Sequence, residues 1–213
     1  MTEIPLILRL KKQRHKEVAL AQDMIIKEVF SVFEDAVFHG GTAIWRCYKG
    51  VRFSEDIDVY IPNDEKRIDL LFRRLQNLGF KLEKRKTNEN GLYSAFWKNR
   101  TIVRFEASFR VMKGVPREYE KCDGNFITVI TLPIEELAKE KISAYQNRLK
   151  VRDLYDLFFL LRYIKDIEII KKELELFVKK FKAPIDKNNL PEIVLESVVP
   201  TVEQMLEYIR RQI

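Results

Sequence analysis

The sequence predicts an α+β fold, a mixed sheet flanked by helices and followed by a helical C-terminal region. Strand-like runs are concentrated in the first 131 residues, whereas the remainder shows helical periodicity. We therefore expect a core of residues 1–131 and a helical region of residues 132–213. A chain of 213 residues is long enough for one large domain or for a core with an appended part.

Composition and charge favour a soluble protein with an anionic partner. The chain has 39 Lys and Arg against 32 Asp and Glu, a net charge of +7, and 46% hydrophobic residues. This balance suits RNA, although many basic proteins bind no nucleic acid. No apolar run is long enough to span a membrane, and the basic residues near the N-terminus follow a short apolar piece instead of preceding it. Cys47 and Cys122 lack CxxC spacing, so we expect reduced thiols in the cytoplasm.

The first expected elements are two helices separated by a pair of glycines. Residues 15–33 place apolar side chains at helical spacing, with Lys and Glu between them. Gly40 and Gly41 follow, and residues 43–48 should form a short helix that closes near Gly50.

A strand, a helix and more strands are expected next. The strand is DIDVYI, and Asn63 should cap the following helix, which ends at Gly79. The later strands should be residues 80–85, 92–97, 101–109 and 126–131.

The region after residue 132 should contain only helices, at residues 133–149, 152–164, 167–181 and 201–212. Two of them carry charges on apolar faces. Lys141 and Arg148 fall inside the buried arc of the first, and Asp153 shares a face with the buried side chains of the second. A buried cation needs an anionic partner, so Lys141 either pairs with Asp153, reaches solvent by snorkelling, or serves a site.

Alternating carboxylates are the first candidate for chemistry. Asp56 and Asp58 leave one face of the DIDVYI strand, roughly 7 Å apart, and can share a divalent-metal site. The alternative to a metal site is a pair of solvated strand residues. Glu106 alternates with the apolar residues of its own strand and therefore lies on the opposite face. It is a candidate third carboxylate, although it could equally pair with Arg104 or with a neighbouring strand.

The glycine pair is the second candidate. Gly40 and Gly41 allow backbone N–H groups to approach an anion, and a helix that begins at Thr42 adds its positive end. An ordinary turn is the alternative, since the GxxxxGK pattern of a P-loop is absent.

Further residues could complete a phosphate site. Arg52 and Ser54 could orient phosphates, although Arg52 could instead pair with Glu55. A phosphate cradle beside metal carboxylates indicates nucleotide chemistry, in which a metal-bound phosphate reacts in line with a hydroxyl.

Two stretches resemble a known family. HGGTAIWRCYKGVRFSEDID (39–58) and EKISAYQNRLKVRDLYDL (140–157) resemble the two signatures of the AbiEii/AbiGii-type nucleotidyltransferases, the toxins of type IV toxin–antitoxin and abortive-infection systems. They stand in the order found in that family, and the resemblance covers about residues 15–165. His39 departs from the common pattern, in which a lysine often precedes the glycines.

The resemblance implies a DNA polymerase β-like nucleotidyltransferase fold, Mg²⁺ or Mn²⁺ as cofactor, an NTP substrate, tRNA or another RNA as acceptor, and an antitoxin partner. The implied roles are triphosphate binding by Gly40, Gly41 and Thr42, metal and nucleotide binding by Ser54, Asp56 and Asp58, and catalysis by Lys141 and by Asp153 as the base.

The resemblance leaves two alternatives to RNA modification. One is transfer to a small hydroxylated molecule, and the other is an inactive nucleotide-binding module. If the two signatures form one site, Lys141 and Asp153 should lie beside Asp58.

Overall fold

The computed structural model describes residues 4–195 and 198–213, and it divides into two compact units. The first contains Met1–Lys49 and Ser54–Leu132, and the second contains Gly50–Phe53 and Pro133–Ile213. The four-residue segment Gly50–Phe53 therefore packs with residues that follow it by more than 80 positions.

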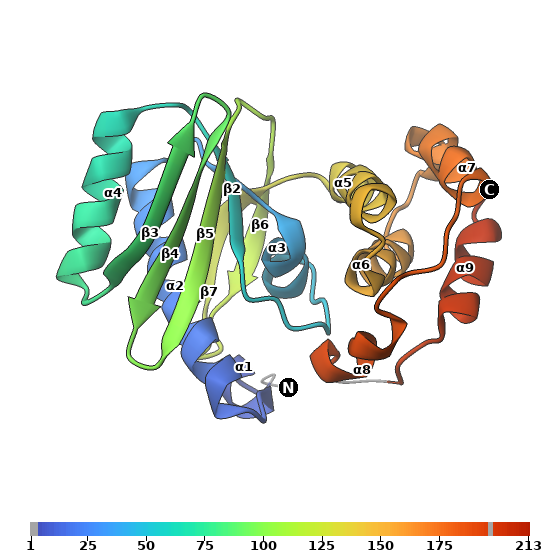
Figure 1. The fold of residues 1–213 in the computed structure, drawn as a ribbon, viewed down its shortest axis with the longest axis horizontal. Helices are drawn as coiled ribbons and strands as arrows, with labels where there is room; N and C mark the ends of the chain where they lie inside the picture. The colour runs from blue at the N-terminus through green and yellow to red at the C-terminus, as the bar shows by residue number, and fades with distance from the viewer. Residues whose placement is uncertain (1–3, 196–197) are drawn as a thin grey trace. The chain divides into compact units, whose positions relative to one another are not determined.

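The first unit is built on a seven-stranded mixed sheet of order β3-β4-β5-β2-β1-β7-β6 (Figure 1). Its strands are β1 (Val37–His39), β2 (Ile57–Ile61), β3 (Lys81–Asn88), β4 (Gly91–Lys98), β5 (Thr101–Phe109), β6 (Val115–Glu120) and β7 (Phe126–Thr131). The pairs β2–β5 and β1–β7 are parallel, and the remaining pairs are antiparallel. An α+β fold with a mixed sheet is thus confirmed.

The two faces of the sheet differ in polarity, as the alternation in β5 predicts. Val103, Phe105 and Ala107 are at most 3% exposed. They belong to the face that α2 (Gln13–Val32) and α4 (Glu65–Asn77) cover. Burying such a Val or Phe side chain contributes about 1.5–3 kcal/mol. The side chains of β5 that alternate with these three are mostly polar, and they project from the opposite face, which is available for a functional site.

Several elements differ from the expectations. The N-cap of α4 is Asp64 and not Asn63, because the Asp64 carboxylate accepts a hydrogen bond from the N–H of Arg67. The sequence reading missed α1 (Leu6–Arg9), β1 and β6. The first two have only four and three residues, and β6 is an edge strand that contains a proline.

Helix α3 (Gly40–Cys47) begins three residues earlier than expected. His39 is its N-cap, so Gly40 and Gly41 form its first turn instead of preceding it. Gly40 has a φ of +75°, a conformation that glycine adopts without the steric cost other residues meet.

The second unit is helical. Its helices are α5 (Ile134–Arg148), α6 (Val151–Leu161), α7 (Lys171–Lys179), α8 (Leu190–Ile193) and α9 (Val202–Arg210), with 3-10 turns at Ile167–Ile169 and Lys187–Asn189. The helix expected at 167–181 is therefore divided, because the backbone leaves helical geometry at Ile170 (φ −125°, ψ 7°). Thr201 and Gln204 form a capping box that fixes the start of α9.

The segment Gly50–Phe53 joins the second unit through main-chain hydrogen bonds. The N–H of Phe53 donates to the carbonyl of Ile193, and the N–H of Leu195 donates to the carbonyl of Val51, each at 2.8 Å. None of the described helices combines the length and apolar character needed to cross a bilayer.

Candidate functional site

Asp58 belongs to a row of polar side chains on the polar face of the sheet. Strand β2 pairs Asp58 with Glu106 of parallel β5 and with His39 of antiparallel β1. Residues paired in register project on the same side, and neighbouring strands are about 4.8 Å apart. The two carboxylates therefore stand next to each other on the polar face, where the alternation placed Glu106.

Gly40 packs directly against Asp58. A Cβ atom added at Gly40 would lie 2.1 Å from Oδ2 of Asp58, so only glycine leaves room for this carboxylate. The contact brings Asp58 to the first turn of α3, whose N–H groups have no carbonyl partner one turn earlier in the helix. A carboxylate and a positively polarised helix end thus share one small region.

Asp56 is held by two interactions just before β2 begins. Its Oδ1 accepts a hydrogen bond from Nε of Arg104 at 2.5 Å, and its main-chain carbonyl accepts one from the Thr42 hydroxyl. Burial opposes the charge of Arg104, but Asp56 and Glu55 outweigh burial and raise its pKa. Arg104 thus pairs with Asp56, a partner that the sequence did not suggest, and the buried Thr42 hydroxyl ties α3 to the strand entry.

The carboxylates fit a metal only when substrate completes its coordination. Across residues 4–195 and 198–213, no group of three or more His, Cys, Asp or Glu side chains converges enough to hold a metal by itself. Mg²⁺ is commonly bound through one or two carboxylates together with substrate phosphates. Asp58 and its neighbour Glu106 supply that donor chemistry next to the α3 N-terminus.

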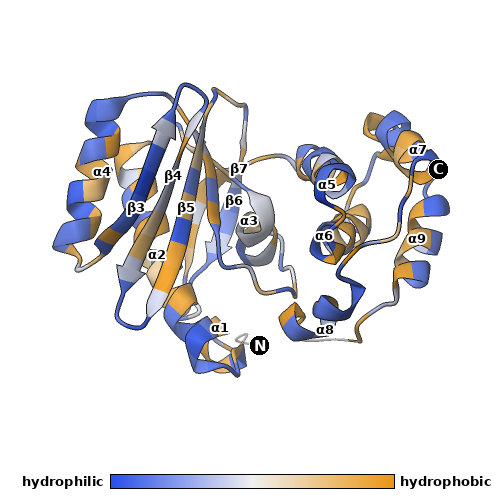
Figure 2. Cartoon of the chain, in the orientation of Figure 1, coloured by the Kyte–Doolittle hydropathy of each residue, from blue (hydrophilic) through white to orange (hydrophobic). Residues whose placement is uncertain are grey.

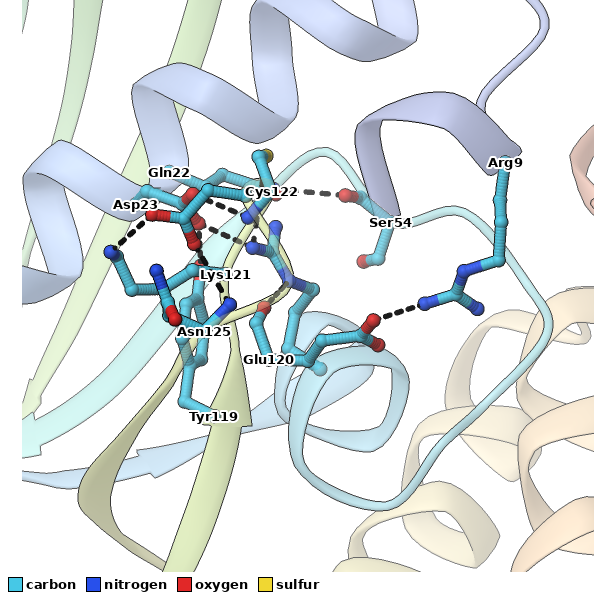
Figure 3. A network of polar contacts seen from close by, with 11 residues as sticks. Arg9, Gln22, Asp23, Ser54, Tyr119, Glu120, Lys121, Cys122 and Asn125 are labelled. Carbon is cyan, nitrogen blue, oxygen red and sulfur yellow. Dashed lines mark hydrogen bonds and ion pairs between the residues drawn. The ribbon is translucent and has the colours of Figure 1, made fainter. Parts of the chain in front are cut away.

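A buried polar network fixes the glycine helix and the loop before β2 (Figure 3). Arg46 of α3 is 2% exposed, pairs with Asp23 of α2, and donates from Nε to the carbonyl of Glu120 at 2.7 Å. Nε2 of Gln22 donates to the carbonyl of Ser54 at 2.9 Å, which holds that residue beside the strand entry. The sequence reading missed this network, although an arginine among the apolar residues of GTAIWRC was a usable signal.

The second unit carries its own buried charge cluster, centred on Asp156. The Arg52 guanidinium binds both Asp156 oxygens at 2.8 Å, and Nζ of Lys141 lies 2.8 Å from Oδ2. Burial by itself raises the pKa of Asp156, but Arg52 and Lys141 outweigh it and lower that pKa to about 2. Asp156 is the main partner of Lys141, and sequence reasoning gave it no role.

Asp153 is fully buried and also engaged. Nε and Nη2 of Arg148 donate to its two oxygens at 2.7 Å each, and Nζ of Lys141 lies 3.6 Å away. The expected burial of Lys141 and Asp153 is confirmed, whereas the expected burial of Arg148 is wrong because its side chain is 44% exposed. The salt bridge between Lys141 and Asp153, one of the alternatives that the sequence offered for Lys141, is present as well.

Arg52 pairs with Asp156 and not with Glu55, which pairs with Arg14 at 3.0 Å. Nη1 of Arg52 also donates a hydrogen bond to the carbonyl of Phe53. The Arg52 side chain is 6% exposed, so this geometry supports an anchor between Gly50–Phe53 and α6 better than a phosphate contact. The approach of Lys141 and Asp153 to Asp58 stays a prediction.

The family model "Nucleotidyl transferase AbiEii toxin, Type IV TA system" matches residues 28–208. The chain belongs to the AbiEii family. It is therefore a nucleotidyltransferase toxin of a type IV toxin–antitoxin system, and both resembling stretches fall within the matched residues.

Solved structures share the fold of this AbiEii chain at low sequence identity. The nucleotidyltransferase toxin MenT4 from Mycobacterium tuberculosis superposes with a TM-score of 0.67 at 17% identity, covering 93% of this chain and 82% of MenT4. JHP933 from Helicobacter pylori superposes with a TM-score of 0.63 at 19% identity, covering 95% of this chain and 90% of JHP933. The antibiotic-resistance factor ANT(2'')-Ia superposes with a TM-score of 0.51 at 13% identity, covering 76% of this chain and 94% of ANT(2'')-Ia. No curated protein matches the sequence.

Proposed function

We propose that this AbiEii toxin transfers a nucleoside monophosphate from an NTP to a hydroxyl of an RNA acceptor, most simply the 3′ end of tRNA, and thereby stops translation. The observation that supports this reaction most directly is the position of Asp58. It stands between Glu106 on one neighbouring strand and the first turn of α3 at Gly40 on the other side.

The reaction is an in-line displacement at the α-phosphorus. The acceptor oxygen forms a bond to phosphorus, the bond to the β-phosphate oxygen breaks, pyrophosphate leaves, and the hydroxyl proton passes to a base. In our proposal, the N–H groups of Gly40, Gly41 and Thr42 bind the triphosphate, and Ser54 supports the nucleotide.

Asp58, with Asp56 and Glu106, is proposed to bind Mg²⁺ or Mn²⁺, which would neutralise phosphate charge when bound. Asp56 must then exchange its hydrogen bond from Arg104 for the metal or for substrate. Arg104 is 43% exposed in its side chain, so it has solvent to move into.

Lys141 and Asp153 are proposed as a phosphate contact and as the base for the acceptor hydroxyl. Each has partners to release first. Asp153 can accept a proton only after Arg148 withdraws from its two oxygens, and the Arg148 side chain is 44% exposed, so it can move into solvent.

Labelled NTPs incubated with total RNA test the proposal, with the parent compared to Asp58→Asn. We expect labelled RNA with the parent and a loss of at least about 100-fold with the variant, because an amide cannot replace a metal-binding carboxylate. Asp35→Asn is the control, since Asp35 is exposed and pairs with Arg67 of α4. Label on a small hydroxylated molecule instead of RNA contradicts the RNA acceptor, and no label with any acceptor contradicts transfer itself.

A further inference from the structure

The polar row at Asp58 continues across the sheet to its edge. Register pairs Glu106 of β5 with Tyr93 of β4, and Tyr93 with Lys86 of β3. The sequence of side chains on this face is therefore Asp58, Glu106, Tyr93 and Lys86, one from each successive strand.

A groove of about 830 Å³ lies over this part of the sheet. Residues of the polar face that line it, which define the edge groove, are Lys86, Asn88, Gly91, Tyr93, Glu106 and Ser108. A Cβ atom at Gly91 would lie 2.5 Å from the carbonyl oxygen of Ala107, so close strand packing requires glycine there.

The wall of the edge groove is basic and aromatic. Strand β3 carries Lys86 in the groove lining and Lys84 beside it, and Figure 2 shows the strand as mostly hydrophilic. Arg85 of the same strand faces α4 instead, where it pairs with Asp69. Nζ of Lys84 lies 5.5 Å from the centre of the Tyr93 ring. Lys84 and Lys86 are exposed.

A second aromatic residue lies on the same face, outside the lining of the groove. Trp97 of β4 projects from the same face as Tyr93, because the two residues are four positions apart in the strand. The Trp97 side chain is 39% exposed. Lysines beside a half-buried tyrosine and an exposed tryptophan form the combination that binds single-stranded nucleic acid, because cations contact phosphates and rings stack on bases.

The position of the edge groove relative to Asp58 indicates which substrate it takes. Gly40 and the α3 N-terminus lie on the β1 side of Asp58, and the edge groove lies on the β5 side. In an in-line displacement the attacking hydroxyl approaches opposite to the leaving pyrophosphate. With the triphosphate at α3, the acceptor comes from the side of the edge groove.

We propose that the edge groove binds the 3′-terminal nucleotides of a single-stranded RNA acceptor, with Tyr93 stacking on a base and Lys84 and Lys86 contacting phosphates. This inference rests on the proposed function. The positive charge of the edge groove disfavours a cationic aminocyclitol, because acidic surfaces attract small acceptors of that kind.

Fluorescence anisotropy of a labelled single-stranded oligoribonucleotide, measured without NTP, tests the binding step. We expect the double variant Lys84→Glu/Lys86→Glu to bind at least tenfold more weakly, and the neutral Lys84→Gln/Lys86→Gln to reduce the slope of log K against log[salt] by about 1.4. The control is Lys27→Glu/Lys66→Glu, which makes the same charge change at exposed positions of α2 and α4 and should bind within about twofold of the parent.

Tyr93 provides a test independent of charge. Tyr93→Phe should keep parent affinity, and Tyr93→Ala should lose roughly tenfold because a stacking ring is removed. Equal affinity of parent, Tyr93→Ala and the lysine variants overturns the inference, as does an equal loss in the α2/α4 control.

Transfer assays on the same variants separate this inference from the proposed function. RNA bound through the edge groove but never labelled contradicts the transfer reaction alone. RNA labelled equally by the parent and by the groove variants contradicts the groove alone.

Discussion

Gly40 is the residue on which the position of Asp58 depends most directly, because it combines a φ of +75° with a carboxylate packed where a Cβ would lie. Gly40→Ala should therefore cost about 1–2 kcal/mol in the free energy of unfolding and at least about 100-fold in transfer rate, since Asp58 must move. Chemical denaturation and the labelled-RNA assay measure the two effects.

Gly79→Ala is the matched control for this prediction. Gly79 has a similar φ of +85°, but an added Cβ would meet only the flexible end of Lys98 at 3.4 Å. It should lose comparable stability and keep its transfer rate. A Gly40→Ala variant that stays fully active would contradict the placement of Asp58 in the site.

Arg104 would compete with a metal ion for Asp56 if Asp56 binds one, and this competition can be measured. If Asp56 is a metal ligand, Arg104→Gln should lower the Mg²⁺ concentration needed for half-maximal transfer several-fold, because the carboxylate no longer has to give up an ion pair at 2.5 Å. Arg100→Gln, in the exposed turn between β4 and β5, should leave that concentration unchanged. Unchanged metal dependence in Arg104→Gln would show that Asp56 is not a ligand.

At residue scale, short-range patterns were predictable and long-range pairs were not. Strand parity placed Glu106 on the polar face because the period of two is a local property. The partner of Arg52 is Asp156, 104 positions away, whereas local reasoning offered its sequence neighbour Glu55. Such pairings depend on tertiary packing, which no spacing rule encodes.

Helices α5 and α6 are joined by the charge cluster at Asp156, and this makes the second unit sensitive to acid. The folded-state pKa of Asp156 is about 2, against 3.8 for an ordinary Asp. Because the folded value is the lower one, the stabilisation is complete above about pH 4 and is lost as pH falls towards 2. Urea titrations across this range should show it as a decline on the order of 2 kcal/mol.

Asp156→Asn should remove that decline and also destabilise the protein at pH 7 by about 3–5 kcal/mol, because Arg52 and Lys141 lose their buried partner. Asp166→Asn, at an exposed position of the same unit, should change stability by no more than about 1 kcal/mol. A parent and Asp156→Asn variant with the same acid dependence would show that another carboxylate governs the transition.

Elements with strong periodicity were predicted well, and short elements were not. Strands β5 and β7 have the expected bounds. Helix α3 begins at Gly40 instead of Ala43, since tertiary contacts at Asp58 and Arg46 stabilise a turn whose glycines have low helix propensity. Local propensity gives no measure of such support.

Growth on expression is the observable that belongs to the whole molecule. Expression of the parent should arrest growth if the toxin modifies RNA, and Asp58→Asn should relieve the arrest at equal protein level. Colony counts with an immunoblot for protein amount measure this outcome. Arrest that persists with Asp58→Asn would mean that toxicity does not come from the proposed reaction.

The division of the chain was also only partly visible in the sequence. A boundary drawn at a single position near 131 has no place for Gly50–Phe53, which packs with the later residues. Sequence patterns order segments along the chain, and a four-residue segment with one arginine gives no compositional signal.

The location of Gly50–Phe53 affects how this gene can recombine. A crossover at residue 132 would deliver a new second unit but keep the old Arg52, and the incoming helix would need an acid at the position of Asp156 to meet it. Arg52 and Asp156 must therefore be inherited as a compatible pair, although the codons that specify them lie far apart. Chimaeras between distant relatives should fail unless residues 50–53 travel with the C-terminal half.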